Sequence, residues 1–180
     1  MIVRWFPFVA FLLTIPIANW MIGNVGTFCT PYGVCLVPVG FGLSAPSGVL
    51  MVGIALVLRD AVHQAMGWKT ALVAIFIGAG LSYAVADPSI VLASVLAFTL
   101  AEILNQVIYA PLYRKRLILA VLVSSTAGTI ADSVLFLWVA FGSLEYLAGQ
   151  IVGKMWMVGL ATLFMWWRSQ SHRIASIRRI

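Results

Sequence analysis

The chain has 180 residues, of which 63% are apolar and only 9% are charged, with a formal net charge of +6. A soluble domain carries about 25% charged residues. This chain therefore has too little polar surface to cover a globule in water, and its surroundings must be lipid. The basic residues stand at the ends of apolar runs rather than on a polar face, which excludes a nucleic-acid-binding protein. Two cysteines are too few for a disulfide framework or a metal site, and we expect no cofactor and no metal.

Six apolar segments are each long enough to cross a hydrocarbon core, which requires about 20 helical residues. The sequence predicts an all-α membrane protein, a single integral membrane domain over residues 1–180 with six transmembrane helices. The first segment starts after Arg4 like a signal peptide, but Ala18, Asn19 and Trp20 form no small-x-small cleavage site, so we expect it to be retained. The predicted spans are residues 5–24, 45–67, 70–87, 89–112, 117–142 and 146–167.

The basic residues outside the spans predict the orientation of the chain. With six spans, both termini and the second and fourth loops share one side of the membrane. Every one of these Lys and Arg residues falls on that side, and the opposite side holds only Asp87 and Glu145. The positive-inside rule places both termini in the cytoplasm. The basic residues are Arg4, Lys69, Arg114, Lys115, Arg116, Arg168, Arg173, Arg178 and Arg179.

Residues 25–44, between the first two spans, are rich in Gly and Pro and yet remain apolar. A plain outer loop would be more polar, so we expect an apolar re-entrant or interfacial segment that could form an outer lid. Cys29 and Cys35 could pair if this segment faces an oxidising compartment. Two free buried thiols are the favoured alternative. On the first span, Asn19 is expected either to hydrogen-bond another helix or to contact a ligand, with neither favoured.

Five ionisable residues lie within the predicted spans: Arg59, Asp60, Glu102, Asp132 and Lys154. Unpaired, they would cost of order 10 kcal/mol in total, so they must be paired, hydrated or neutralised. Two bases and three acids leave one acid over. We expect this surplus to favour a neutral or weakly cationic ligand that offers N–H donors. The alternative is a purely structural network of ion pairs.

Two of the acids belong to polar stripes on neighbouring apolar helices, joined by a short basic turn. The stripes have the i, i+3, i+4, i+7 spacing of one helix face. They predict that the two helices face each other, or face one wet cavity near the bilayer midplane. The first stripe is Glu102, Asn105, Gln106 and Tyr109, and the second is Ser125, Thr129, Asp132 and Ser133.

The second and sixth spans carry the remaining buried charges. Arg59 and Asp60 are adjacent and point about 100° apart on a helix, so we expect each to meet a partner on another helix. His63 is expected to be a hydrogen-bonded histidine near the cytoplasmic end. Lys154 lies too deep to reach the outer surface easily and follows Gln150 at i, i+4 spacing.

Several separated motifs, in this order, resemble the VUT family of vitamin uptake proteins, whose better-known members are queuosine precursor transporters of the bacterial inner membrane. The resemblance runs from about Asn19 to Lys154. It implies a six-helix importer of 7-deazaguanine precursors such as preQ0 or preQ1, and a likeness to the substrate-binding subunits of energy-coupling-factor vitamin transporters. The motifs are Leu58-Arg59-Asp60-Ala61-Val62, Ala101-Glu102, Val107-Ile108-Tyr109, Arg114, Ser124-Ser125, Gly128, Asp132-Ser133, Phe136, Gly149-Gln150 and Lys154.

One motif departs from the family pattern. The fourth helix of the family usually has the form S-E-x-x-D before V-Y, whereas this chain has Ala101 in place of the serine and Asn105 in place of the aspartate. The chain thus loses an acid and keeps a hydrogen-bonding amide. The change bears on proton coupling and on the substrate more than on the fold.

These observations predict an inner-membrane transporter of a modified purine base rather than an enzyme, since HExxH and GxSxG motifs are absent. In this prediction Glu102 and Asp132 bind the donor edge of the base. Arg59 and Lys154 hold the acids in place. The further candidate contacts are Asn105, Gln106, Ser125, Asn19 and Asp60.

Two kinds of protein partner are compatible with the sequence. A binding subunit would need an ATP-driven energy-coupling partner, which could dock on the small residues Ala10, Thr14 and Ala18 of the first span, although ordinary helix packing is the favoured explanation of this ladder. Apolar faces rich in small residues also permit a homodimer.

Overall fold

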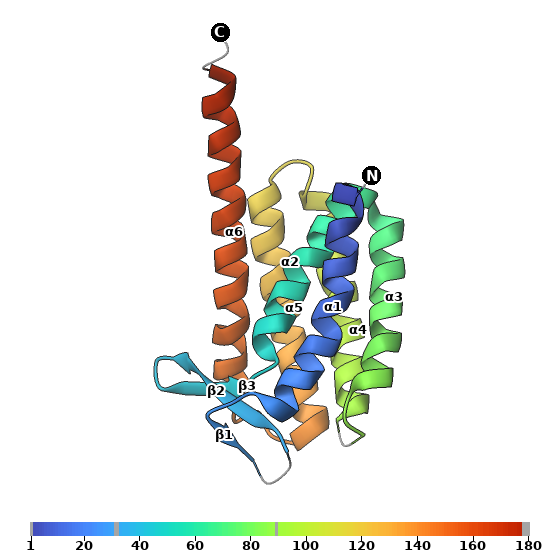
Figure 1. Ribbon diagram of the computed structural model, residues 1–180, viewed down its shortest axis with the longest axis vertical. Coiled ribbons are helices and arrows are strands. Elements are labelled where there is room, and N and C mark those ends of the chain that lie inside the picture. Colours follow the sequence, from blue (N-terminus) through green and yellow to red (C-terminus); the bar gives the residue numbers. More distant parts are fainter. Residues whose placement is uncertain (1, 31–32, 89, 178–180) are drawn as a thin grey trace.

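The computed structural model describes residues 2–30, 33–88 and 90–177. Within these residues the chain forms six helices packed side by side, with a small sheet across one end of the bundle (Figure 1). The helices are α1 (Ile2–Asn24), α2 (Val49–Met66), α3 (Trp68–Val85), α4 (Val91–Leu112), α5 (Leu117–Phe141) and α6 (Leu147–Ile177). The strands are β1 (Phe28–Cys29), β2 (Cys35–Gly40) and β3 (Leu43–Pro46).

The predicted class is confirmed, because all six helices are long and apolar enough to cross a membrane. Two boundaries differ from the predicted spans by more than three residues. α2 begins at Val49 rather than residue 45, because residues 43–46 are extended and pair with β2. α6 continues to Ile177 rather than ending near residue 167, since no proline or glycine follows Gly159 in this stretch to stop it.

The outer faces of the helices are apolar and the polar side chains point inward. Leu13, Phe76 and Trp138 are each more than half exposed, as expected for side chains that contact lipid. The buried polar side chains include Thr14, Arg59, Asp60, His63, Ser82, Glu102, Asn105, Gln106, Ser125, Thr129, Asp132, Gln150 and Lys154. This distribution is the reverse of a soluble protein, and the chain is a multi-pass membrane protein.

The segment between α1 and α2 forms a three-stranded antiparallel sheet in the order β1-β2-β3. The sequence did not predict these strands. Pairing satisfies the backbone N–H and C=O groups of an apolar segment without a helix, and Gly40 and Gly42 adopt positive φ at the tight turn between β2 and β3. The sheet lies at the end of the bundle away from both termini (Figure 1). A re-entrant or lid role for it stays a prediction.

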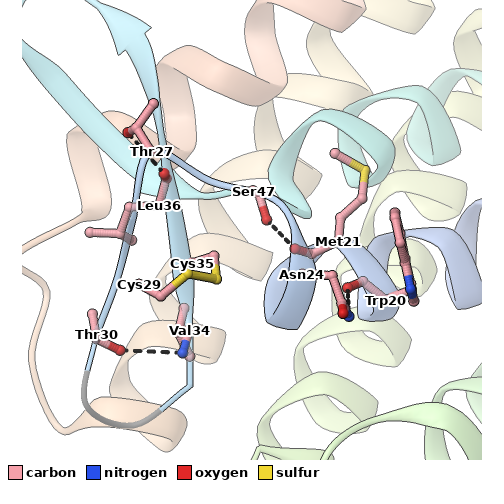
Figure 2. The surroundings of a disulfide bond; sticks show 10 residues. All are labelled: Trp20, Met21, Asn24, Thr27, Cys29, Thr30, Val34, Cys35, Leu36 and Ser47. Carbon is pink, nitrogen blue, oxygen red and sulfur yellow. Dashed lines mark hydrogen bonds between the residues drawn. A yellow bond between two sulfur atoms is a disulfide. The ribbon is translucent and has the colours of Figure 1, made fainter.

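A disulfide joins Cys29 and Cys35 across β1 and β2 (Figure 2). The favoured expectation of two free thiols is therefore wrong. The antiparallel register of β1 and β2 places the two cysteines directly opposite each other. Ser47, just after β3, donates a hydrogen bond of 2.6 Å to the carbonyl of Met21 and so ties the sheet to the end of α1.

Glycines allow α6 to pack closely against α2 and the sheet. A Cβ added at Gly53 would lie 2.7 Å from the carbonyl oxygen of Lys154. One added at Gly149 would overlap the carbonyl of Ser44 on β3. These contacts allow Lys154 to reach the centre of the bundle, because the backbone that carries it lies directly against α2.

The disulfide bears on the orientation of the protein. Disulfides persist in oxidising compartments and are rare in the cytosol, so we predict that the sheet end faces outward. The charges of the loops give the same orientation, since both termini and the α2–α3 and α4–α5 connections lie at the opposite end (Figure 1).

Labelling of intact cells with a membrane-impermeant maleimide tests this orientation. The chain holds only two cysteines, so we expect labelling after treatment with an impermeant reductant and none before it. Labelling without reduction would show free thiols. Labelling only after lysis would place the sheet in the cytoplasm.

Candidate functional site

Arg59 is fully buried and gathers a group of polar side chains from α2 and α4. Its Nε lies 3.0 Å from Oε2 of Glu102, and its Nη1 donates a 2.6 Å hydrogen bond to Oε1 of Gln106. Gln106 also contacts Nδ1 of His63. We call Arg59, Asp60, His63, Glu102 and Gln106 the Arg59 cluster. It confirms the expected link between Arg59 and an acid on another helix.

Asp60 does not behave as the sequence predicted. Its Oδ1 lies 3.0 Å from Nη2 of Arg59, so the adjacent residues do contact each other. The long arginine side chain folds back toward its neighbour while its Nε and Nη1 reach α4. Both oxygens of Asp60 are nevertheless buried without a well-formed hydrogen bond, and among the described residues no side chain of another helix pairs with Asp60.

Lys154 centres a second group, which we call the Lys154 cluster and which joins α5 to α6. Its Nζ donates hydrogen bonds to Oδ2 of Asp132, to Oγ of Ser133 at 2.7 Å and to Oε1 of Gln150 at 2.9 Å. Lys154 is 1% exposed. Both expected ion pairs, Arg59–Glu102 and Lys154–Asp132, are therefore present. Their role toward a ligand stays a prediction.

A cavity of about 70 Å³ opens beside the Lys154 cluster. Asp132, Gln150 and Lys154 line it together with Asn19 on α1 and two phenyl rings, Phe98 and Phe136. All six helices contribute to its wall. Asp132 is nine residues from the end of α5, about 13 Å along a helix axis, so the cavity lies well inside the bundle.

The predicted site residues thus fall into two groups instead of one shared pocket. Asn19, Asp132 and Lys154 line the cavity. The other six do not: Arg59, Asp60, Glu102, Asn105, Gln106 and Ser125 are buried beside it, between α2, α4 and α5. Asn19 makes no interhelical hydrogen bond to the described residues, because its Nδ2 donates to the carbonyl of Ile15 on its own helix and its Oδ1 is buried without a partner; its contact with a ligand stays a prediction.

Some cavity residues were missed as site residues. Phe98, Ser82 and Ser94 line the cavity, but an aromatic ring or a serine in a transmembrane helix carries no distinctive signal. Thr14 and Ala18 of the small-residue ladder also line it and are 5% and 6% exposed. These two residues face the inside of the bundle, which supports ordinary packing over a docking surface.

A second, larger cavity of about 370 Å³ lies toward the sheet end. Its walls are the last turns of α1, the turn before β2 and the connection between α3 and α4. Asn19 and Ile22 line both cavities. The two cavities are therefore neighbours that share a wall made of these two side chains.

The stripes of α4 and α5 face each other, as predicted, but leave polar atoms unsatisfied. A Cβ at Gly128 would lie 3.2 Å from Cβ of Asn105 and 3.2 Å from Leu56, so α2, α4 and α5 meet at this point. Both amide atoms of Asn105 and the hydroxyls of Ser125 and Thr129 are buried with no hydrogen-bond partner. All three residues are 0% exposed.

Comparison with known proteins now adds to this geometry. The family described as "putative vitamin uptake transporter" matches residues 82–168. These residues are similar to that family. The match covers α4, α5 and most of α6, including Glu102, Asp132 and Lys154, and it confirms the resemblance to the vitamin uptake family. Neither a curated protein nor a solved structure gives a significant match.

The match indicates a membrane transporter, which implies a small-molecule substrate and a lipid bilayer. The cavity offers such a substrate one carboxylate, one ammonium, two amides and two aromatic rings. Such groups can donate and accept hydrogen bonds, and the rings offer flat faces for stacking.

Removal of Lys154 tests how strongly its ion pair holds the bundle together. Lys154→Met leaves Asp132 buried without its partner, which costs about 3–5 kcal/mol, so the protein should melt at a clearly lower temperature in detergent. The double variant Lys154→Met/Asp132→Leu removes both charges and should recover most of that loss.

Lys69→Met, at an exposed lysine, is the matched control and should leave the melting temperature unchanged. A Lys154→Met variant as stable as the parent would contradict the importance of the pair. So would a double variant no more stable than the single one.

Proposed function

We propose that this protein imports a 7-deazaguanine precursor of queuosine across the bacterial inner membrane. The observation that carries the proposal is the inner cavity, where a carboxylate, an amide and two phenyl rings converge from several helices. A deazaguanine presents ring and amine N–H donors, a carbonyl acceptor and a flat face. Each of these features has a complement among the side chains of the cavity.

Asp132 is the acid best placed to bind the donor edge. Lys154 occupies its Oδ2, and the carboxylate side chain is 12% exposed, so Oδ1 remains open to a ligand. Gln150 and Asn19 supply amides for the acceptor and donor groups that remain, and Phe98 and Phe136 supply faces for stacking. Glu102 contacts Arg59 rather than the cavity, so its effect on the ligand is indirect.

The charge of the cavity favours a neutral ligand. Asp132 and Lys154 cancel each other there, and the surplus acid belongs to the Arg59 cluster instead. A cationic ligand would add an uncompensated charge inside the bundle. We therefore favour preQ0, which is neutral, over preQ1, which carries an amine.

The larger cavity supports a route of entry from the sheet end. A ligand would enter beside the disulfide-linked sheet and pass Asn19 and Ile22 to reach Asp132. A volume of about 70 Å³ holds only a few water molecules, so the helices must part when a bicyclic base binds. Alternating exposure of one enclosed site is the expected mode of transport.

Uptake in bacteria that cannot make the precursor tests this function. With preQ0 in the medium, the wild-type gene should restore queuosine in tRNA, whereas Asp132→Asn should lower uptake at least about 10-fold, the value of one charged hydrogen bond. Glu102→Gln should also abolish uptake, because it removes the negative charge that pairs with Arg59.

Glu145→Gln is the matched control, since Glu145 is an exposed acid outside the helices, and it should transport normally. Membrane insertion of each variant is checked by immunoblot. Normal uptake by a well-inserted Asp132→Asn variant would refute the assigned site. Uptake of a vitamin but of no deazaguanine would refute the substrate class.

A further inference from the structure

The Arg59 cluster carries one negative charge too many for its surroundings. Asp60 and Glu102 both contact the single guanidinium of Arg59. His63 is turned to the amide of Gln106 rather than to either acid. The only other buried ions in the described helices, Asp132 and Lys154, form a neutral pair of their own. The excess charge of the buried network therefore lies here, where a lone ion is expensive.

Oxygen atoms without a hydrogen bond lie on α2 and α4, which carry this cluster, and on the neighbouring α5. Asp60 is one helical turn beyond Leu56 on α2, and Ser125 is almost one turn before Gly128 on α5, in the antiparallel direction. Leu56, Asn105 and Gly128 meet. Asp60 and Ser125 therefore lie on the two helices that flank Asn105, each about one turn from this point of contact. The oxygens without a hydrogen bond are Oδ2 of Asp60, Oδ1 of Asn105, Oγ of Ser125 and Oγ1 of Thr129, whereas Oδ1 of Asp60 lies 3.0 Å from Nη2 of Arg59.

We propose that these oxygens form a binding site for a sodium ion between α2, α4 and α5. Carboxylate, amide and hydroxyl oxygens are the ligands of a hard cation, and one monovalent ion neutralises the one surplus charge. Within the described residues no three His, Cys, Asp or Glu side chains converge on a metal, which argues against a divalent ion. A proton would neutralise the acid but would leave Asn105, Ser125 and Thr129 unsatisfied.

The position of the site beside the cavity gives it a consequence for transport, which rests on the proposed function. Thr129 is almost one turn from Asp132 on α5, so an ion held by Thr129 restrains the segment that places the cavity carboxylate. Sodium binding would then raise the affinity for the ligand, and the ligand would raise the affinity for sodium by the same factor.

Binding of ²²Na⁺ to the purified protein in detergent, with choline as the replacement cation and no organic ligand present, tests the ion site alone. We expect saturable binding of one ion per chain. We also expect the melting temperature to rise by about 5 °C between choline chloride and sodium chloride. Thr129→Val should lose both effects, and Ser125→Ala should weaken both.

Thr126→Val is the matched control, because the hydroxyl of Thr126 already donates a 2.7 Å hydrogen bond to Leu122, and it should bind sodium like the parent. Absence of ²²Na⁺ binding to the parent overturns the proposal. So does a Thr129→Val variant that binds sodium normally, as expected if water fills the space. Because no organic ligand is present, sodium binding with no uptake would refute only the proposed function.

Discussion

The structure depends on the compensation of five charged side chains inside a bundle that lipid surrounds. Each lies in a helix, and each is at most 8% exposed as a whole residue. Removing a charge from water costs several kcal/mol, so the packing of α2, α4, α5 and α6 is tied to the two ion pairs. The glycines that bring α6 against α2 serve the same end, because they let Lys154 reach Asp132 rather than the lipid.

The residues that were predicted to share one pocket form two separate clusters in the structure. The Lys154 cluster is neutral, lines the cavity and suits a neutral ligand. The Arg59 cluster keeps the surplus acid, does not line the cavity and shares its helices with oxygens that lack a hydrogen bond. α5 connects the two, because Thr129 and Asp132 share one of its faces.

Much of the fold was predictable because lipid imposes simple rules on length and hydropathy. The six helices follow from apolar runs of sufficient length. Likewise, the inward direction of Glu102 and Asp132 follows from the cost of exposing a carboxylate to lipid. The sheet of residues 28–46 was not predictable in this way, because short apolar strands rich in Gly and Pro lack a periodic signal. The disulfide depends on the register of that sheet.

The sequence predicted which charged and polar side chains lie inside the bundle, but not how they are arranged. Spacing along one helix places Glu102 and Asn105 on a common face, yet it does not reveal which neighbour each side chain meets. Arg59 reaches both Asp60 and Glu102 because its side chain is long and flexible. Such a choice is made by tertiary packing. Tertiary packing likewise decides that Phe98 and Phe136 line the cavity.

The most direct test of the central claim is equilibrium binding of preQ0 to the purified protein, measured beside Asp132→Asn in the same detergent and salt. The claim predicts saturable binding by the parent and an affinity at least about 10-fold weaker in Asp132→Asn. Equal affinity in the two proteins, or no binding of preQ0 by a folded parent, would contradict it.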